Sequence, residues 1–232
     1  AANAGGPLLR VTRDGTPAET RAELARLRPQ EIYVAGGTAV ISHSVVNSLG
    51  GYATSGKATR LAGADRYGTA AAVATSAFAN GVEVVYLATG LGFADALSAG
   101  AAAAAVDGAV LLSNPDRLPA SIAGALRTLR PSQVILVGGT AALSSGIEAE
   151  LKALGVATVR RISGSNRYAT AAAISVDTFA PDVPAVLLAT GAQFPDALAG
   201  AAAAGELGVP LLLTEPTRTP SVIINELRRL LK

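Results

Sequence analysis

Residues 60–70 read RLAGADRYGTA and residues 161–171 read RISGSNRYATA, so the same phrase occurs twice, 101 positions apart. Between residues 60–113 and 161–214, 25 of 54 aligned positions are identical without a gap. A second overlap, displaced by 102 positions, pairs RPQEIYVAGGTAVIS (28–42) with RPSQVILVGGTAALS (130–144). Self-similarity at a fixed period indicates a chain built from repeated structural units. The sequence therefore predicts tandem repeats of about 101 residues.

The two overlaps also divide the chain. We expect residues 1–57 to form the second half of a module and residues 58–157 to form a complete module. Residues 158–232 then correspond to the first three quarters of a third module.

Short apolar runs alternate with alanine-rich segments within each repeat. Runs such as QVILVGG (133–139) are typical of parallel strands covered on both faces, and the longer alanine-rich segments are typical of crossover helices. The sequence therefore predicts an α/β fold of three-layer, Rossmann-like modules with mostly parallel sheets. The predicted strands are 7–11, 31–35, 58–61, 84–88, 109–112, 133–137, 157–162, 185–189 and 209–213. The predicted helices are 17–27, 42–49, 66–79, 95–105, 119–129, 143–153, 167–179, 196–206 and 220–231.

Composition excludes several classes of function. The chain has 19 basic and 17 acidic residues, no run of Lys or Arg longer than two, and 4% aromatic residues, which argues against nucleic-acid binding. The most apolar stretch, 84–106, is interrupted by Asp95 and by glycines, so we expect no membrane span. Cysteine is absent, which excludes disulfides and thiolate nucleophiles.

Comparison of equivalent positions in the repeats shows no set of catalytic residues that both copies keep. The single histidine, His43, corresponds to Ser145, so a histidine base would exist in one copy alone. Asp65 corresponds to Asn166, and both residue types cap helix N-termini well, which favours a structural role. No Ser–His arrangement and no close carboxylate pair is kept in both copies. We therefore expect no catalytic residue, no metal ligand and no cofactor.

Asp95 and Asp196 are different, because both copies of TGxxFxDAL keep the carboxylate. The simpler interpretation places each in the first turn of a helix, where a negative charge complements the helix dipole. The alternative is a contact with another element or with a ligand. Arg66 and Arg167 are the natural partners, because an arginine in a first helical turn opposes the dipole and should find a carboxylate or an anion.

Further candidate residues flank these charges. The tyrosines beside the arginines either pack with a hydroxyl at the surface or contact a ligand. The glycines of VAGGTA (34–39) and VGGTAA (137–142) favour tight turns with positive φ over a phosphate cradle, because neither loop matches a nucleotide motif. The remaining candidate ligand-binding residues are Tyr67, Tyr168, Thr89, Gly90, Thr190 and Gly191.

Four stretches together resemble the cell-wall-binding repeat 2 family: RISGSNRYATA, VLLATGAQFPDALAGAAAA (186–204), VPLLLTEP (209–216) and VILVGGTAALS (134–144). The resemblance extends from Pro7 to Lys232. It implies a Toprim-like fold in modules that occur in tandem, commonly three around a pseudo-threefold centre, on surface proteins of Gram-positive bacteria. Because three complete modules would need about twelve β/α units and nine are predicted, the chain is either a fragment or is completed by neighbouring chains.

The resemblance also implies a function. Such modules anchor a secreted protein noncovalently to an anionic wall polymer, either teichoic-acid-like or a secondary wall polysaccharide, at the extracellular surface. The family's polymer-contacting stretch is similar to PLLL here, although the hydrophobic pattern predicts a buried strand. Those residues are Pro210, Leu211, Leu212 and Leu213. The alternative function is a surface-layer or homo-oligomeric module whose repeated faces bind other copies of the chain.

Overall fold

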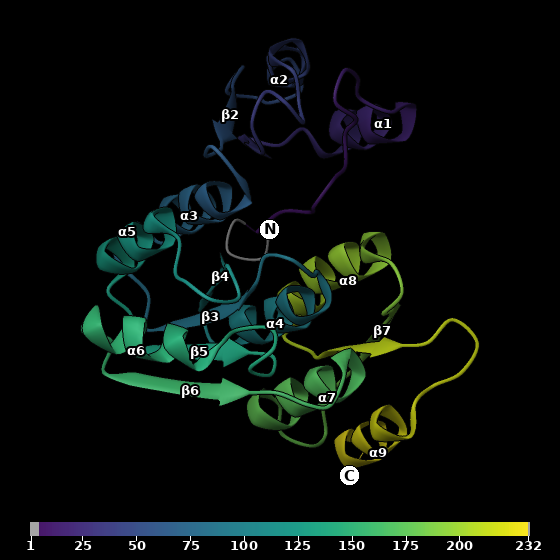
Figure 1. The fold of residues 1–232 in the computed structure, drawn as a ribbon. Helices are drawn as coiled ribbons and strands as arrows, with labels where there is room; N and C mark the ends of the chain where they lie inside the picture. Colours follow the sequence, from purple (N-terminus) through teal and green to yellow (C-terminus); the bar gives the residue numbers. More distant parts are fainter. Residues whose placement is uncertain (1–4, 232) are drawn as a thin grey trace.

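The computed structural model describes residues 5–231 of the chain and shows helices and parallel strands in alternation (Figure 1). Residues 1–4 and 232, the outermost residues of the first and third predicted units, lie outside the described residues. The helices are α1 (Ala18–Leu27), α2 (His43–Gly50), α3 (Arg66–Ala77), α4 (Ala94–Ala105), α5 (Ala120–Leu129), α6 (Ser145–Ala153), α7 (Arg167–Thr178), α8 (Phe194–Leu207) and α9 (Ser221–Leu230). The strands are β1 (Ile32–Ala35), β2 (Ala58–Leu61), β3 (Val84–Thr89), β4 (Ala109–Ser113), β5 (Gln133–Val137), β6 (Thr158–Ile162), β7 (Leu187–Thr190) and β8 (Leu211–Thr214). The predicted α/β class is confirmed.

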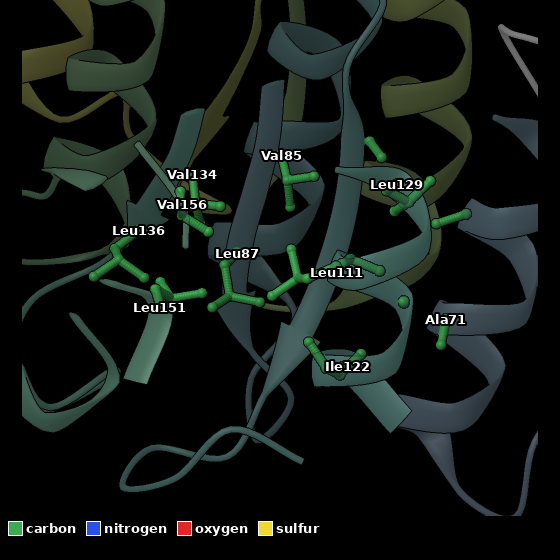
Figure 2. Close-up of a cluster of buried hydrophobic side chains, with 14 of the residues drawn as sticks. Ala71, Val85, Leu87, Leu111, Ile122, Leu129, Val134, Leu136, Leu151 and Val156 are labelled. Atoms are coloured by element: carbon green, nitrogen blue, oxygen red, sulfur yellow. The ribbon is translucent and has the colours of Figure 1, made fainter. Parts of the chain in front are cut away.

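Four parallel strands form the central sheet, in the order β4-β3-β5-β6. Successive side chains of a strand point to opposite faces. Val85 and Leu87 of β3 therefore pack with α3, α5 and α6, whereas Tyr86 and Ala88 pack with α4. Figure 2 shows the first of these two clusters, in which Ile122 of α5 lies beside the strands. The sheet is the middle of three layers, as the apolar runs predict.

Two smaller sheets reproduce halves of the central one. The parallel pair β1-β2 has the register of β5-β6, and the parallel pair β7-β8 has the register of β3-β4. The predicted strand at 7–11 is wrong: this segment corresponds to β4, whose partner in the central sheet is β3. The described residues of the first unit contain no counterpart of β3, so the segment has no ladder to join, and Leu8 and Leu9 are exposed.

The sheets and the repeats are cut at different places. β6 lies in the third predicted unit, yet it forms the edge of the central sheet by pairing with β5. A repeat can be divided at any phase without changing its period, whereas a sheet ends only where the hydrogen-bonded ladder ends. The division into residues 1–57, 58–157 and 158–232 remains a prediction.

The repeated phrase RxxGxxRYxTA builds the entry to α3 and to α7. Its glycine lies against the first turn of the helix, and a Cβ on Gly164 would overlap the carbonyl carbon of Ala169. The amide of Gly164 donates a hydrogen bond to the Thr170 hydroxyl (3.1 Å), and Gly63 donates to Thr69 in the same way (3.2 Å). Only glycine permits this close approach of loop and helix.

We expect Gly164→Ala to destabilise the protein by roughly 1–3 kcal/mol, the usual cost of forcing extra volume into a packed position. Urea denaturation followed by circular dichroism measures the change. Gly124→Ala is the matched control, because Gly124 lies in α5 with no atom within 4 Å of the added Cβ. That variant should gain about 0.5–1 kcal/mol from helix propensity. Equal stability of the two variants would contradict the proposed overlap.

Small residues join the second unit to the third. α4 and α8 pack along their length, and the buried residues at their contact are alanines, including Ala94, Ala101, Ala197 and Ala204. A Cβ on Gly100 would lie 3.5 Å from the Cβ of Ala201, so the two backbones are close. Because α4 and α8 begin at equivalent positions of the repeat, this packing brings two copies of the TGxxFxDAL turn together.

Candidate functional site

The first turns of α3 and α7 have the same construction. Asp65 accepts a hydrogen bond from the amide of Gly68 (2.7 Å), and Asn166 accepts from the amides of Tyr168 and Ala169 (both 3.0 Å). Both residues are therefore N-caps, as the exchange of aspartate for asparagine predicts. The following residue in each copy is an arginine at the start of the helix.

Each of these arginines donates to the turn after the next strand of its own repeat. Nη1 of Arg66 donates to the carbonyl of Gly90, and Nη1 of Arg167 donates to the carbonyl of Gly191. A carbonyl is neutral, so the hydrogen bond fixes the guanidinium without cancelling its charge. Among residues 5–231 neither arginine forms an ion pair with a carboxylate, and both side chains are exposed.

The positions of the tyrosine rings explain why these turns contain glycine. A Cβ on Gly191 would lie 2.8 Å from the ring of Tyr168, and the ring of Tyr67 covers Gly90 more closely still. The hydroxyl of Tyr67 donates to the side chain of Asn114 (2.7 Å). Glycine is required here by the contact with the ring, and Tyr67 is buried.

The threonines shape the same two turns. Thr89 accepts a hydrogen bond from the amide of Leu91, and Thr190 accepts one from the amide of Ala192, both at 3.2 Å. These bonds hold the chain as it leaves β3 and β7 and enters the next helix. The glycines of the other two loops behave as predicted, since Gly36 and Gly138 have φ of 127° and 102°.

Asp95 and Asp196 both lie in the first turn of a helix, α4 and α8 respectively, as expected. One of the two expected arginines acts on one of these carboxylates. Arg167 is the cation that acts on Asp95, so the interaction joins a carboxylate of one repeat to an arginine of the next. Asp196 is exposed, and Arg66 donates to the carbonyl of Gly90, with no ion pair to Asp95 among residues 5–231. This electrostatic interaction links neighbouring repeats, and a comparison of the repeats one by one does not reveal it.

The Asp95 carboxylate lies against Gly138 at the carboxyl end of β5, where an added Cβ would be 2.5 Å from Oδ2. Burial raises the pKa of Asp95 above its ordinary value, and the positive charge of Arg167 partly opposes that shift. A raised carboxyl pKa means that the folded protein prefers the protonated form.

We therefore expect wild-type stability to fall as pH rises from the unfolded-state pKa of this group through its higher folded-state pKa. Asp95→Asn should remove this dependence and unfold at higher urea concentration than wild type at pH 7. Below the unfolded-state pKa the two proteins should become alike. Urea titrations across this pH range measure the difference, and a constant difference between the two proteins would contradict a raised pKa.

Four side chains gather where the second and third repeats meet; we call them the arginine–phenylalanine cluster: Arg10, Phe93, Arg167 and Phe194. The rings of Phe93 and Phe194 lie 6.3 Å apart, inclined at 60°. The guanidinium of Arg167 lies 5.5 Å from the centre of the Phe93 ring, and that of Arg10 lies 5.5 Å from the centre of the Phe194 ring. Such cation–π contacts orient a guanidinium without neutralising it.

Sequence reasoning missed three of these four residues. The signal for Phe93 and Phe194 was present, because both copies of TGxxFxDAL keep the phenylalanine. Arg10 had no such signal, since it belongs to a segment expected to be a strand. Phe194 is 44% exposed, so the cluster lies at the surface.

The stretch Pro210–Leu213 lies in the interior instead. Leu211, Leu212 and Leu213 are at most 3% exposed, and the carbonyl of Pro210 accepts a hydrogen bond from Leu187 across the β7-β8 ladder. The buried strand predicted by the hydrophobic pattern is confirmed. These leucines support the turn at the end of β7 and do not present their side chains to solvent.

The rest of the described structure offers fewer groups that could bind a ligand or a metal ion. No three His, Asp or Glu side chains of residues 5–231 are grouped so as to hold a metal ion. Over the same residues, none of the helices has the length and hydropathy to cross a bilayer. A hollow of about 640 Å³ lies at the amino ends of β3 and β5, lined by residues that include Glu83 and Arg130. The hollow has both an acidic and a basic side chain in its lining. It also lies away from the turns of TGxxFxDAL, so it is separate from the arginine–phenylalanine cluster.

The fold is that of a repeated α/β protein, and its candidate site is a pair of surface arginines over neighbouring aromatic rings. The chain belongs to the family described as Cell wall binding domain 2 (CWB2), whose sequence profile matches residues 60–148 and 161–229. The resemblance found in the repeated phrases is thereby confirmed, and so is an association with the cell wall.

Two curated proteins of Bacillus subtilis (strain 168) are similar to this chain. N-acetylmuramoyl-L-alanine amidase LytC is 34% identical over 158 residues, and the amidase enhancer is 35% identical over 161 residues. The matches cover 68% and 69% of this chain, but 31% and 22% of those proteins. The shared part is the binding region.

Two solved structures from Clostridium difficile have the same fold. Cwp6 gives a TM-score of 0.88 over 97% of this chain and 36% of its own chain, and Cwp8 gives 0.84 over 98% and 39%. Both are 24% identical to this chain, so they show the fold.

Proposed function

We propose that this chain is a non-catalytic anchor that holds a secreted protein at the cell surface by binding an anionic wall glycopolymer. Teichoic-acid-like chains and secondary wall polysaccharides both present repeated phosphate or carboxylate groups. The observation that carries the proposal is the arginine–phenylalanine cluster, in which Arg10 and Arg167 lie over neighbouring rings. Neither forms an ion pair with a carboxylate among the described residues.

The chemistry of the cluster suits such a polymer. A guanidinium presents a planar fork of donors that matches phosphate and carboxylate oxygens. The exposed face of Phe194 offers apolar area against which the less polar face of a sugar ring can pack. Arg66 and the amides at the starts of α4 and α8 add positive potential around the turns.

Repetition supports a mechanism of many weak contacts. The second and third repeats each carry an arginine, a tyrosine and a glycine turn, and a polymer carries many equivalent anions. Linked sites gain affinity because the second contact forms at high effective concentration. Contacts between exposed charges are screened by salt, so binding should weaken as ionic strength rises.

Retention on purified wall tests the proposal. Wall that keeps its secondary polymers should retain the protein, and wall from which these polymers have been extracted should retain much less. Equal retention on stripped peptidoglycan would overturn the anionic-polymer assignment. It would leave the family membership unaffected.

A second candidate function is a homo-oligomeric assembly module. The repetition itself favours it, because equivalent faces recur along the chain. Sedimentation without wall material separates the two functions. A pseudo-threefold group of three complete modules remains a prediction.

A further inference from the structure

The tyrosine hydroxyls of the second and third repeats have different surroundings. In the second repeat the hydroxyl of Tyr67 donates to the side chain of Asn114, the residue that follows β4. By the offset of 101 residues, the counterpart of Asn114 is Glu215, which follows β8. Both carboxylate oxygens of Glu215 accept hydrogen bonds from Arg218 in the same loop (2.5 and 3.2 Å). Within the described part of the chain the Tyr168 hydroxyl has no hydrogen-bond partner.

The Tyr168 hydroxyl lies at the surface beside this ion pair. The side chain is half-buried, and among the described residues only the side-chain oxygens of Thr16 and Ser98 are both enclosed and without a partner. The pKa of Arg218 is raised, chiefly by the hydrogen bond and the charge of Glu215, and Tyr168 adds to the shift. Electrostatic effects fall with distance, so these three side chains are neighbours. The surface thus contains a hydroxyl whose hydrogen-bonding capacity is unused.

These side chains lie at the carboxyl ends of two paired strands. Gly191 follows β7 and Glu215 follows β8, and the two strands pair in parallel. The ring of Tyr168 lies against Gly191, where an added Cβ would be 2.8 Å from a ring carbon. Ligands of open parallel sheets bind outside the carboxyl ends of the strands. Because Arg167 donates to the carbonyl of Gly191, this position adjoins the arginine–phenylalanine cluster.

We propose that Tyr168 and Glu215 bind a sugar hydroxyl of the wall glycopolymer, next to the anionic group that Arg167 binds. The sugar hydroxyl donates its proton to the Glu215 carboxylate and accepts a hydrogen bond from Tyr168. Arg218 holds the carboxylate in position. The inference rests on the proposed function, because it assigns a second chemical group of the same polymer to a surface beside the cluster.

The charges at this surface favour a hydroxyl over a second anion. Glu215 and Arg218 balance each other, and an ionised carboxylate accepts hydrogen bonds without donating any. A sugar hydroxyl both donates and accepts, so it matches a carboxylate beside a tyrosine hydroxyl. A phosphodiester or a carboxylate of the polymer has no proton to donate, and the charge of Glu215 would repel it. The second repeat lacks this surface, because Tyr67 is buried and already donates to Asn114.

Affinity for wall that keeps its secondary polymers tests the role of Tyr168. Tyr168→Phe keeps the ring and removes the hydroxyl, so affinity should fall about fivefold, the usual effect of one hydrogen bond. Its stability in urea should match that of wild type, because the hydroxyl has no partner among the described residues. Tyr67→Phe is the matched control and should behave in the opposite way. It should unfold at lower urea concentration, because it loses the bond to Asn114, and should bind wall as the wild type does.

Glu215→Gln separates a sugar hydroxyl from a second anion. With a hydroxyl bound, the variant should lose about threefold in affinity, because an amide oxygen accepts a weaker hydrogen bond than a carboxylate. With a phosphate or carboxylate bound there, it should bind more tightly, since a repelling charge is removed. Glu206→Gln removes the same charge from an exposed residue at the far end of α8, and so measures the effect of net charge alone. A Glu215→Gln variant that binds as well as Glu206→Gln, or better, would overturn the proposal.

Failure of this inference is distinguishable from failure of the proposed function. If wall stripped of its secondary polymers retains the wild type as well as intact wall does, the anionic-polymer assignment fails and the sugar contact fails with it. If retention requires the polymers but Tyr168→Phe binds as tightly as Tyr67→Phe, the anchor function stands and the sugar contact alone is overturned.

Discussion

Replacing Arg10 and Arg167 together by alanine is expected to reduce affinity for polymer-bearing cell wall by about a hundredfold. A hydrogen bond to a charged group contributes about 1.5–3 kcal/mol, and each 1.4 kcal/mol corresponds to tenfold in affinity. Each single variant should therefore lose about tenfold. Retention on purified wall at several salt concentrations measures these losses, and the double variant should also show a weaker dependence on salt.

Two further variants separate charge from structure in this experiment. Arg127→Ala removes an exposed arginine at the end of α5, next to the amino ends of the strands, and should bind as the wild type does. Arg167→Lys keeps the charge but loses the planar fork, so it should fall between wild type and Arg167→Ala. Equal binding of the Arg10/Arg167 double variant and Arg127→Ala would remove the basis for the proposed site.

Replacing Arg229 by alanine is expected to destabilise the third unit by about 3 kcal/mol, because it leaves a buried carboxylate without its countercharge. Arg229 donates to both carboxylate oxygens of Glu226 (2.7 and 2.8 Å) and to the carbonyl of Phe179 (2.8 Å). Glu226 is 4% exposed and also accepts from the Ser175 hydroxyl. This network ties α9 to α7, and urea denaturation measures its loss.

Arg218→Ala is the matched control for that prediction. Arg218 and Glu215 form an ion pair at the same spacing of three residues, but the Arg218 side chain is 76% exposed. Exposed ion pairs are screened by water and salt, so this variant should change stability little. If both variants unfold at the same urea concentration, burial is not what makes the Arg229 network stabilising.

In the third unit, a buried hydrogen-bond network supports the helix whose first turn presents Arg167 at the surface. The buried network fixes α9 on α7, and the first turn of α7 carries Arg167. A cation held in place at the surface loses less conformational entropy on binding than a freely moving one. We therefore expect Arg229→Ala to weaken wall binding only to the extent that the unit unfolds.

The sequence by itself determined the class of the fold and the position of nearly every element. The repeated phrase marked the starts of α3 and α7, and the alternation of apolar runs with alanine-rich segments marked strands and helices. These features are local, because capping, side-chain period and glycine at a close approach depend on residues a few positions apart. Asp65 and Asn166 could be assigned as caps for that reason.

Only the tertiary structure decided which repeats share a site and which strands find partners. The segment 7–11 has a strand sequence but lacks a neighbour, and strand formation depends on a ladder with another segment. The packing of α4 on α8 likewise brings Phe93 to Phe194 and Arg167 toward Asp95, residues that are far apart along the chain. Contacts between repeats arise from the packing of their surfaces, and a comparison of the repeats with one another carries no information about that packing.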